Sequence, residues 1–305
     1  MPARFPRIPR LRKPIWVADS NNRSGYLLVV AAATLWGTTG TSQALAPAGA
    51  TPPVIGALRL ALGGVALVLI ALVRGRFKST APWPLRSTLL AAVCMAAYQV
   101  FFFGGVALTG VAIGTIVGIG SCPIMGGLLG YLFRAERPGR AWLIATLLAV
   151  SGAGLLASTS GDLHINLWGL LMALGAGATY AAFTLFSKDL LDSQPSEPAL
   201  AVVFCLGALL LSPLLFTADL HWILQPSGAL VTAHLGLITV GLAYTLFGKG
   251  LQRVPVSTTT TLTLAEPLTA GILGITLLGE RLTPTAVAGI LLIFSGIVVL
   301  SLAHK

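Results

Sequence analysis

The apolar runs of this sequence constrain its fold more than any other feature. Runs of about 20 mainly apolar residues, the length that crosses the hydrocarbon core of a bilayer, recur along almost the whole chain. Only 9% of the residues are charged and 55% are hydrophobic, whereas a soluble domain carries about a quarter charged residues. So few charges could not cover the surface of a soluble protein of 305 residues. The sequence therefore predicts an all-α integral membrane protein.

Ten membrane spans are predicted when prolines, glycines and charge clusters are taken as boundaries. The predicted spans are 24–46, 53–74, 86–108, 111–133, 138–158, 166–188, 197–217, 228–251, 256–279 and 284–303. The connections between them are short, so we expect a single compact membrane domain. Residues 1–23 precede the first span and are expected to form a basic N-terminal tail on the cytoplasmic side.

The first predicted span has one alternative interpretation. Arginines, then an apolar run, then the small residues Ala44-Leu45-Ala46 are also the pattern of a cleaved signal peptide. However, Pro47 follows directly, and the run has membrane length and contains Trp36 and Gln43. A retained transmembrane helix is therefore the favoured interpretation.

The basic residues predict how the spans are oriented. With the N-terminus inside, all but two of the 19 Lys and Arg residues fall in cytoplasmic tails or loops, as the positive-inside rule requires. The exceptions are Arg59, inside a span, and Arg281, in an outer loop. We expect both termini in the cytoplasm and the chain in a plasma membrane of the bacterial inner-membrane type. The net charge of +10 belongs to these loops and is not taken as a sign of nucleic-acid binding.

The two halves of the chain resemble each other. Short motifs recur in both halves in the same order: Ala97-Tyr98 and Ala243-Tyr244, Pro123 and Pro267, Glu136-Arg137 and Glu280-Arg281, and Ser151-Gly152 and Ser295-Gly296. Five predicted spans separate equivalent points, and an odd number means that the halves face opposite ways. The pattern predicts two inverted five-helix repeats, residues 24–160 and 161–305, around a central cavity. Chance similarity between apolar helices is the alternative, and the offset of 144 residues shared by the last three pairs argues against it.

At this point the sequence resembles a known family. Trp36-Gly37, Arg59 and Glu266-Pro267, placed in ten spans with inverted halves, resemble the EamA-type transporters of the drug/metabolite transporter superfamily. The resemblance covers the chain from residue 24 onward and is greatest to bacterial exporters of aromatic and other neutral amino acids. It implies ten helices around a substrate cavity, alternating access and no ATP-hydrolysing domain. The first half departs from the pattern, because Cys122-Pro123 stands where the family often has a Glu-Pro-like element.

Two prolines and two glycines are predicted to shape helix movement. Pro123 and Pro267 lie inside spans and leave the carbonyl four residues earlier without a helical donor, which predicts matched kinks beside a cavity. Gly114 and Gly118 belong to a row of small residues spaced by four, which allows a second helix to approach closely. The row is consistent with a moving interface used in gating or with static tight packing. Prolines are also commoner in membrane helices than in soluble ones.

Arg59 and Glu266 are the two ionisable residues that lie well inside predicted spans. A charge at the bilayer centre costs at least about 2.5 kcal/mol, so it normally faces a partner or a wet cavity. Glu266 could be neutral, could form a structural pair or could couple transport to protons. Arg59 could hold a substrate carboxylate, or its charge could reach the outer interface along its flexible stem.

Other polar and aromatic residues within the spans could complete a binding site. They are Trp36, Thr39, Ser42, Tyr98, Gln99, Tyr180, Tyr244, Thr258 and Thr261. An amino acid needs donors and acceptors for its charged ends and apolar or aromatic walls for its side chain, and this set supplies both. We expect these residues, with Arg59 and Glu266, to bind substrate. The alternative for any single Trp or Tyr is a place in a membrane-interface belt.

The sequence offers no support for an enzyme. It contains no phosphate-binding loop, no His/Cys cluster spaced for a metal and no nucleophile–base–acid set, so no cofactor or metal is expected. Its three cysteines lie in apolar runs and are interpreted as packing residues. The expected partners are a small-molecule substrate and the lipid bilayer. The leading function is a secondary exporter of amino acids or similar metabolites. The alternatives are a drug or other metabolite transporter of the same superfamily and a structural or signalling membrane protein.

Overall fold

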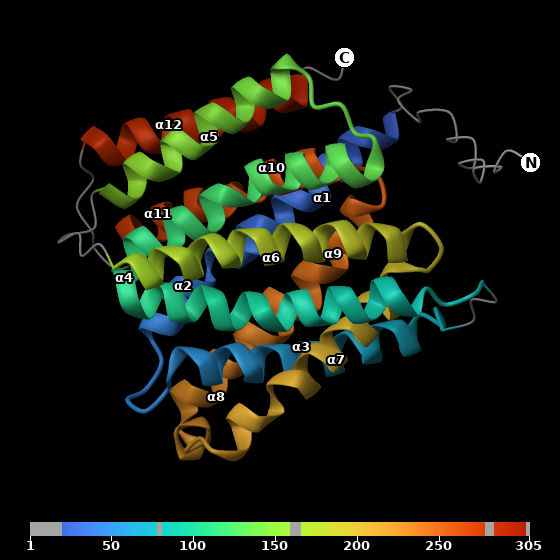
Figure 1. Cartoon of the computed structure of the whole chain (residues 1–305). Helices are drawn as coiled ribbons and strands as arrows, with labels where there is room; N and C mark the ends of the chain where they lie inside the picture. Colours follow the sequence, from blue (N-terminus) through green and yellow to red (C-terminus); the bar gives the residue numbers. More distant parts are fainter. Residues whose placement is uncertain (1–19, 78–80, 159–165, 278–283, 303–305) are drawn as a thin grey trace, which may run out of the picture.

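The computed structural model describes residues 20–77, 81–158, 166–277 and 284–302, and these residues form helices without any strand (Figure 1). Lipid offers the backbone no hydrogen-bond partners, so the chain satisfies its amides and carbonyls within helices. The elements are α1 Ser20–Gly37, α2 Thr39–Ala44, α3 Pro52–Val73, α4 Leu85–Arg134, α5 Arg140–Ser158, α6 Leu167–Leu191, α7 Ser196–Phe216, η1 His221–Leu224, α8 Pro226–Ala233, η2 His234–Leu242, α9 Ala243–Leu251, α10 Val256–Leu262, α11 Ala265–Leu277 and α12 Pro284–Leu302. The all-α prediction is confirmed.

Ten helical segments run along the bundle. Six are long and apolar enough to cross a membrane by length and composition: Pro52–Val73, Leu85–Thr109, Val117–Arg134, Leu167–Leu191, Ser196–Phe216 and Pro226–Leu251. Arg140–Leu155 and Val287–Leu300 are shorter apolar helices. The remaining two segments are α1 and the pair α10–α11. At about 1.5 Å per residue, α3 is about 33 Å long, close to the thickness of the hydrocarbon core.

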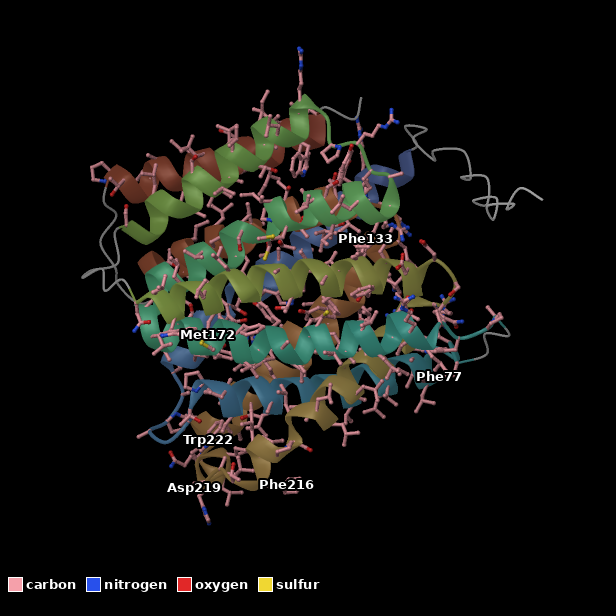
Figure 2. The ribbon with its side chains drawn as sticks, viewed as in Figure 1. Phe77, Phe133, Met172, Phe216, Asp219 and Trp222 are labelled. Atoms are coloured by element: carbon pink, nitrogen blue, oxygen red, sulfur yellow. The ribbon has the colours of Figure 1, made fainter. Side chains whose placement is uncertain are left out.

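The outer surface of the bundle is apolar, as a surface in contact with lipid should be. Large hydrophobic side chains stand exposed on the outside of several helices, among them Leu209 on α7 (67% exposed), Phe216 at its end (86%) and Phe294 on α12 (58%). Figure 2 shows Phe216 at the edge of the bundle. A soluble monomer rarely exposes large contiguous apolar surface, so these faces fit a membrane environment.

Helix α4 combines two of the predicted spans. Its first arm, Leu85–Thr109, and its second arm, Val117–Arg134, are separate membrane-length segments. A side chain on Gly118 would lie 3.4 Å from the Phe102 ring, whereas these residues would be about 24 Å apart along a straight helix. The chain therefore reverses direction between the arms without leaving helical geometry, and both arms lie beside α6 (Figure 1).

The corresponding segments of the second half are interrupted. Between α8 and α9 the chain forms the π-helix η2, His234–Leu242, and π-helical turns inside helices are frequent at functional sites. The predicted span 256–279 is divided into α10 and α11 at Thr263 and Leu264. Because Pro267 has no amide hydrogen, the Thr263 carbonyl instead accepts from the Glu266 amide at 3.0 Å.

Equivalent helices of the two halves run in opposite directions. In Figure 1 α1 and α6 are antiparallel, and so are α5 and α12. Helix α3 packs against α7, and α5 packs against α12. Helix α1 packs against α9, as its counterpart α6 packs against α4. The two inverted five-helix repeats are thus confirmed.

The two ends of the bundle differ in charge. The end at which α3 meets α4, α4 meets α5, α6 meets α7 and α9 meets α10 carries Arg74, Arg134, Lys188, Lys249 and Arg253. We call it the basic end; the start of α1 and the end of α12 also lie there (Figure 1). In Figure 2, Phe77 and Phe133 lie toward the basic end, and Trp222 and Asp219 lie toward the opposite end.

Gly63 lies at a close approach between α3 and η2. A Cβ atom there would overlap the Val240 side chain and lie 3.0 Å from the Gly236 carbonyl oxygen. We therefore expect Gly63→Leu to force α3 and η2 apart and to lower the unfolding temperature in detergent by at least about 5 °C. Gly40→Leu is the matched control, because nothing lies within 4 Å of a Cβ at that position. Equal stability of the two variants would contradict this close packing.

Candidate functional site

Four aromatic residues from four helices meet at the centre of the bundle. The ring centroids of Trp36 on α1 and Tyr244 on α9 are 4.8 Å apart, and those of Tyr98 on α4 and Tyr180 on α6 are 5.3 Å apart. Trp36 and Tyr180 join the two pairs edge to face at 6.2 Å. Three of the four residues, Trp36, Tyr180 and Tyr244, are at least 94% buried, with exposures of 4%, 6% and 3%. We call these four residues the aromatic quartet.

The quartet has the symmetry of the two repeats. Trp36 and Tyr180 are separated by the same 144 residues as Pro123 and Pro267. Each lies on the first long helix of its repeat and contacts a Tyr from the other repeat. The predicted residues Trp36, Tyr98, Tyr180 and Tyr244 are therefore brought together at the junction of the two halves.

Hydrogen bonds tie the end of α1 to the π-helix. The Trp36 indole Nε1 donates to the Thr239 carbonyl at 2.8 Å. Thr38 Oγ1 lies 2.8 Å from His234 Nε2, also in η2. His234 was not among the predicted site residues, since nothing local in the sequence indicates that it faces α1. The π-helix thus positions Trp36 within the quartet.

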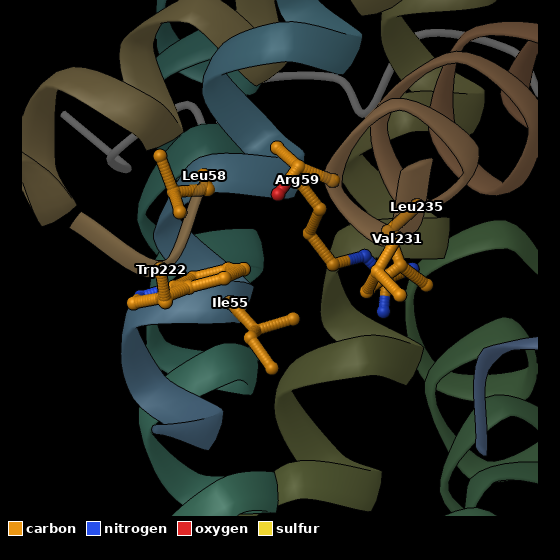
Figure 3. A pocket seen from close by; sticks show the side chains of 7 residues that line it. Ile55, Leu58, Arg59, Trp222, Val231 and Leu235 are labelled. Carbon is orange, nitrogen blue, oxygen red and sulfur yellow. The ribbon is translucent and has the colours of Figure 1, made fainter. Parts of the chain in front are cut away.

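Arg59 lies at a narrow crevice between the repeats. The crevice is too narrow to hold a water molecule and is lined by Ile55, Leu58, Arg59, Trp222, Val231, Thr232 and Leu235. Figure 3 shows the Arg59 side chain extending from α3 toward Val231 and Leu235. Its Nε atom is buried and has no hydrogen-bond partner. An unpaired buried donor on a charged group is costly, so this guanidinium is suited to receive an anionic ligand.

Glu266 begins α11 beside the end of α1. A side chain on Gly37 would lie 2.6 Å from the Glu266 carbonyl oxygen, so the absence of a side chain there lets α11 approach the residue next to Trp36. Arg59 is close enough for its charge to act on Glu266, Tyr98 and Tyr244. The ion pairs of the described residues nevertheless do not include one between Arg59 and Glu266. Two opposite charges therefore face the same region without neutralising each other by contact.

Three other predicted residues lie near this region. Gln99 is 4% exposed, and its amide nitrogen contacts the sulfur of Met95 at 3.6 Å. Thr39 and Ser42 lie on α2, at the end of the bundle opposite the basic end. The Thr39 hydroxyl is buried and has no hydrogen-bond partner, which leaves it able to contact a ligand.

The threonines of α10 occupy a different place. Every residue of α10 is buried, including Thr258 and Thr261. The Thr261 hydroxyl lies 3.1 Å from that of Thr146 on α5 and donates to the Ser257 carbonyl at 3.0 Å. Thr261 therefore already has partners in helix packing, and a substrate role for Thr258 and Thr261 stays a prediction.

The predicted kink and gating residues lie at close helix contacts. Pro123 is inside α4 without interrupting it, whereas the chain is broken just before Pro267. A side chain on Gly114 would lie 2.7 Å from the Val106 Cα atom, and one on Gly118 would lie 3.6 Å from the Ala173 carbonyl on α6. These glycines allow the arms of α4 to pack against each other and against α6. Whether they also move in gating stays a prediction.

Polar contacts between the repeats gather at the basic end, and sequence reasoning did not find them. Glu197 on α7 pairs with Arg74 on α3 at 3.0 Å and with Lys249 on α9 at 3.3 Å. Arg134 at the end of α4 pairs with Asp189 and with Asp192, the latter at 2.7 Å. These ion pairs join residues that are more than 50 positions apart in the sequence. The only available signal was acids and bases at span ends on the same side of the membrane.

Lys188 and Glu136 are buried at the same end. Lys188 is 8% exposed, and its ammonium donates to the carbonyls of Leu251 and Val254, the latter at 3.1 Å. Glu136 is 3% exposed and accepts hydrogen bonds from α10. The sequence places Lys188 at the end of a predicted span and Glu136 in a motif of the repeat, and it predicts no partner for either residue. Polar contacts therefore join packed helices at the basic end.

The described residues form ten helical segments in two inverted repeats, and this is an architecture of membrane transporters. The model of the EamA-like transporter family matches residues 23–158 and again residues 167–302. The chain therefore belongs to the EamA-like transporter family, and the resemblance inferred from the sequence is confirmed.

Relatives from bacteria agree with this assignment. The chain is 49% identical to the uncharacterized transporter YwfM of Bacillus subtilis (strain 168), covering 92% of this chain and 94% of that protein. It is 33% identical to the threonine/homoserine exporter RhtA of Escherichia coli (strain K12), covering 90% of this chain and 88% of RhtA. One solved crystal structure superposes with a TM-score of 0.81 at 22% identity, covering 92% of this chain and 97% of that chain. That last likeness concerns the fold alone.

Proposed function

We propose that the chain is a secondary exporter of neutral amino acids. The observation that carries this proposal is the pair Arg59 and Glu266, which face one region of the inter-repeat interface without an ion pair between them. A free amino acid carries a carboxylate and an ammonium, and it can neutralise both residues at once. The name of the relative RhtA, a threonine/homoserine exporter, supports the same class of substrate.

In this proposal the two charged residues divide the recognition of the amino acid. The Arg59 guanidinium offers a fork of donors that matches a carboxylate, and its unpaired Nε is one of them. The Glu266 carboxylate accepts from the ammonium. The substrate side chain then lies against the aromatic quartet, which offers the apolar faces of one indole and three phenol rings. The ring centroids of its two pairs are 4.8 Å and 5.3 Å apart. Neutral side chains suit this wall because it is formed by uncharged aromatic rings.

The direction of transport follows from topology. We propose that the basic end is cytoplasmic, because loops rich in Lys and Arg are retained on that side. The substrate then enters from the basic end and leaves at the opposite end, where the Arg59 crevice and α2 lie. Binding at the junction of inverted repeats allows the same contacts to be reached from either side.

Export from cells tests this proposal. A bacterial host without its own threonine exporters is fed a threonine dipeptide, and threonine, homoserine, phenylalanine and tyrosine are measured in the medium after feeding the corresponding dipeptides. We expect expression of the chain to raise the release of at least one neutral amino acid several-fold. The matched control is the Arg59→Met/Glu266→Gln double variant at the same membrane abundance. Release equal to the control for every amino acid contradicts the proposal.

A cationic drug is the second candidate substrate of this family of folds. A cation needs Glu266 but gains nothing from Arg59, which would repel it. The unpaired guanidinium therefore favours the amino acid. If Arg59→Met increases the export of a lipophilic cation, the result would instead support a cationic drug as the substrate.

A further inference from the structure

Glu136 bridges the two repeats at the basic end. It follows α4 directly, after Ala135, whose φ of 52° is in the left-handed region that side chains rarely adopt. This turn aims the Glu136 side chain back into the bundle. A side chain on Gly130 would collide with the Glu136 carboxylate, so the glycine makes room for it.

The carboxylate holds the start of α10 through three hydrogen bonds. The Val256 amide donates to Oε1 at 2.7 Å, the Ser257 amide donates to Oε2 at 3.0 Å, and the Ser257 hydroxyl donates to Oε2 at 2.7 Å. The acceptor belongs to the first repeat and all three donors belong to the second. Trp142 on α5 adds a contact of the same kind, donating to the Ser257 carbonyl at 3.0 Å.

Among the described residues, no cation forms an ion pair with this carboxylate. Arg134 and Lys188 are near enough for their charges to interact with Glu136, but Arg134 bonds Asp189 and Asp192, and Lys188 bonds backbone carbonyls. Breaking an ion pair strands a buried opposite charge at high cost. The donors of α10 are neutral, so no cation is stranded when the contact opens, and the Glu136 carboxylate must then exchange its three protein donors for water that enters at the basic end.

The contact also marks a boundary in packing along the second repeat. Residues 251, 254 and 256–265 are all buried, whereas residues 266–271 of α11 are all half-buried. The path between the repeats is thus sealed from the basic end down to the residue before Glu266. Substrate can reach Glu266 from the basic end only after α10 separates from the elements that cover it.

We propose that Glu136 is a gating residue: its carboxylate closes the basic end by holding Val256 and Ser257, and its release accompanies opening of the substrate site to that end. This inference rests on the proposed function only in taking the chain to transport by alternating access. It assigns a role to a residue that neither contacts the substrate region nor belongs to the aromatic quartet.

Hydrogen–deuterium exchange of the full chain in lipid nanodiscs tests the contact itself. Glu136→Gln keeps the shape of the side chain but turns an amide NH₂ toward donors, so it cannot accept all three bonds. We expect the peptide that covers Val256–Leu262 to exchange at least about ten-fold faster. The matched control is Glu197→Gln, a carboxylate of the same 3% exposure at the same end that binds Arg74 and Lys249, and it should leave that peptide unchanged.

Exchange at the parent rate in Glu136→Gln, or an equal increase in Glu197→Gln, overturns the proposal. If Glu136→Gln does not give folded protein, Ser257→Ala replaces it, because it removes one donor and keeps the carboxylate. The exchange rate of the same peptide is then expected to rise roughly two- to three-fold. An unchanged exchange rate overturns the proposal. This measurement needs no substrate, so it decides the role of Glu136 even if no amino acid is transported.

Transport kinetics separate a gate from general loss of structure. In proteoliposomes, Glu136→Gln should favour the state open to the basic end, which lowers the apparent KM for threonine there and raises it at the opposite face. We expect shifts of roughly five-fold in opposite directions. Damage to the fold lowers the maximal rate at both faces without such a reciprocal shift. Changes of KM in the same direction at both faces, or none, overturn the proposal.

Discussion

Replacing Arg59 with Met is expected to raise the KM for amino-acid transport by about 10- to 100-fold, the loss of one or two charge-assisted hydrogen bonds. The Nε atom of Arg59 has no hydrogen-bond partner in the protein, so removing the guanidinium strands no hydrogen-bond partner at that atom. The folded state should therefore be retained, with Glu266 losing the favourable charge of Arg59. Initial rates of threonine uptake over a range of concentrations measure the effect.

Two comparisons make the Arg59 result specific. Arg76→Met removes an exposed arginine that follows α3 and should leave KM unchanged. Threonine methyl ester lacks the carboxylate, so the parent should discriminate strongly against it, whereas Arg59→Met should hardly distinguish the ester from threonine. Unchanged discrimination in Arg59→Met would show that this guanidinium does not bind the carboxylate.

Glu266→Gln is expected to reduce transport of the same amino acids by at least about ten-fold, because the ammonium loses its charged partner. N-acetylthreonine lacks the ammonium and isolates this contact. The parent should reject it, and the variant should discriminate between threonine and N-acetylthreonine far less. Asp219→Asn is the control, since Asp219 is an exposed acid paired with His221 at 2.7 Å, outside the bundle core.

The same variant decides whether Glu266 couples transport to protons. If Glu266 only binds the ammonium, a pH gradient imposed on the parent should drive no accumulation of threonine. If it carries protons, the parent should accumulate threonine under the gradient, and Glu266→Gln should lose the accumulation while still exchanging substrate. Normal transport of neutral amino acids by Glu266→Gln in both conditions would remove Glu266 from the substrate site.

The fold could be predicted from the sequence because the membrane imposes it locally. Each apolar run had to become a helix of membrane length, and repeated motifs such as Pro123 and Pro267 related the two halves. How single spans join, reverse or break was harder to predict from the sequence. The 86–108 and 111–133 runs join in one reversing helix. Pro267 predicted a kink near Thr263, but the sequence does not show why the helix breaks there while Pro123 leaves α4 uninterrupted.

The site could be predicted in part for a related reason. Trp36, Tyr98, Tyr180 and Tyr244 stood out because large amphipathic rings inside spans are few, and the structure brings them together. Thr261 was predicted as a polar contact for the substrate, and this role stays a prediction; in the structure its hydroxyl lies 3.1 Å from that of Thr146. The contact of Glu136 was not predicted because its partners Val256 and Ser257 are about 120 positions away in the sequence. No local pattern indicates a contact between neutral backbone donors and a distant carboxylate.

The measurement that tests the central claim most directly is counterflow with the purified chain in liposomes. Vesicles are loaded with an excess of unlabelled threonine or phenylalanine, and the labelled amino acid is added outside. We predict transient, saturable accumulation of label for at least one neutral amino acid, abolished in the Arg59→Met/Glu266→Gln double variant. If a panel of neutral amino acids shows no accumulation above empty vesicles, although the protein is folded, amino-acid transport by this chain is contradicted.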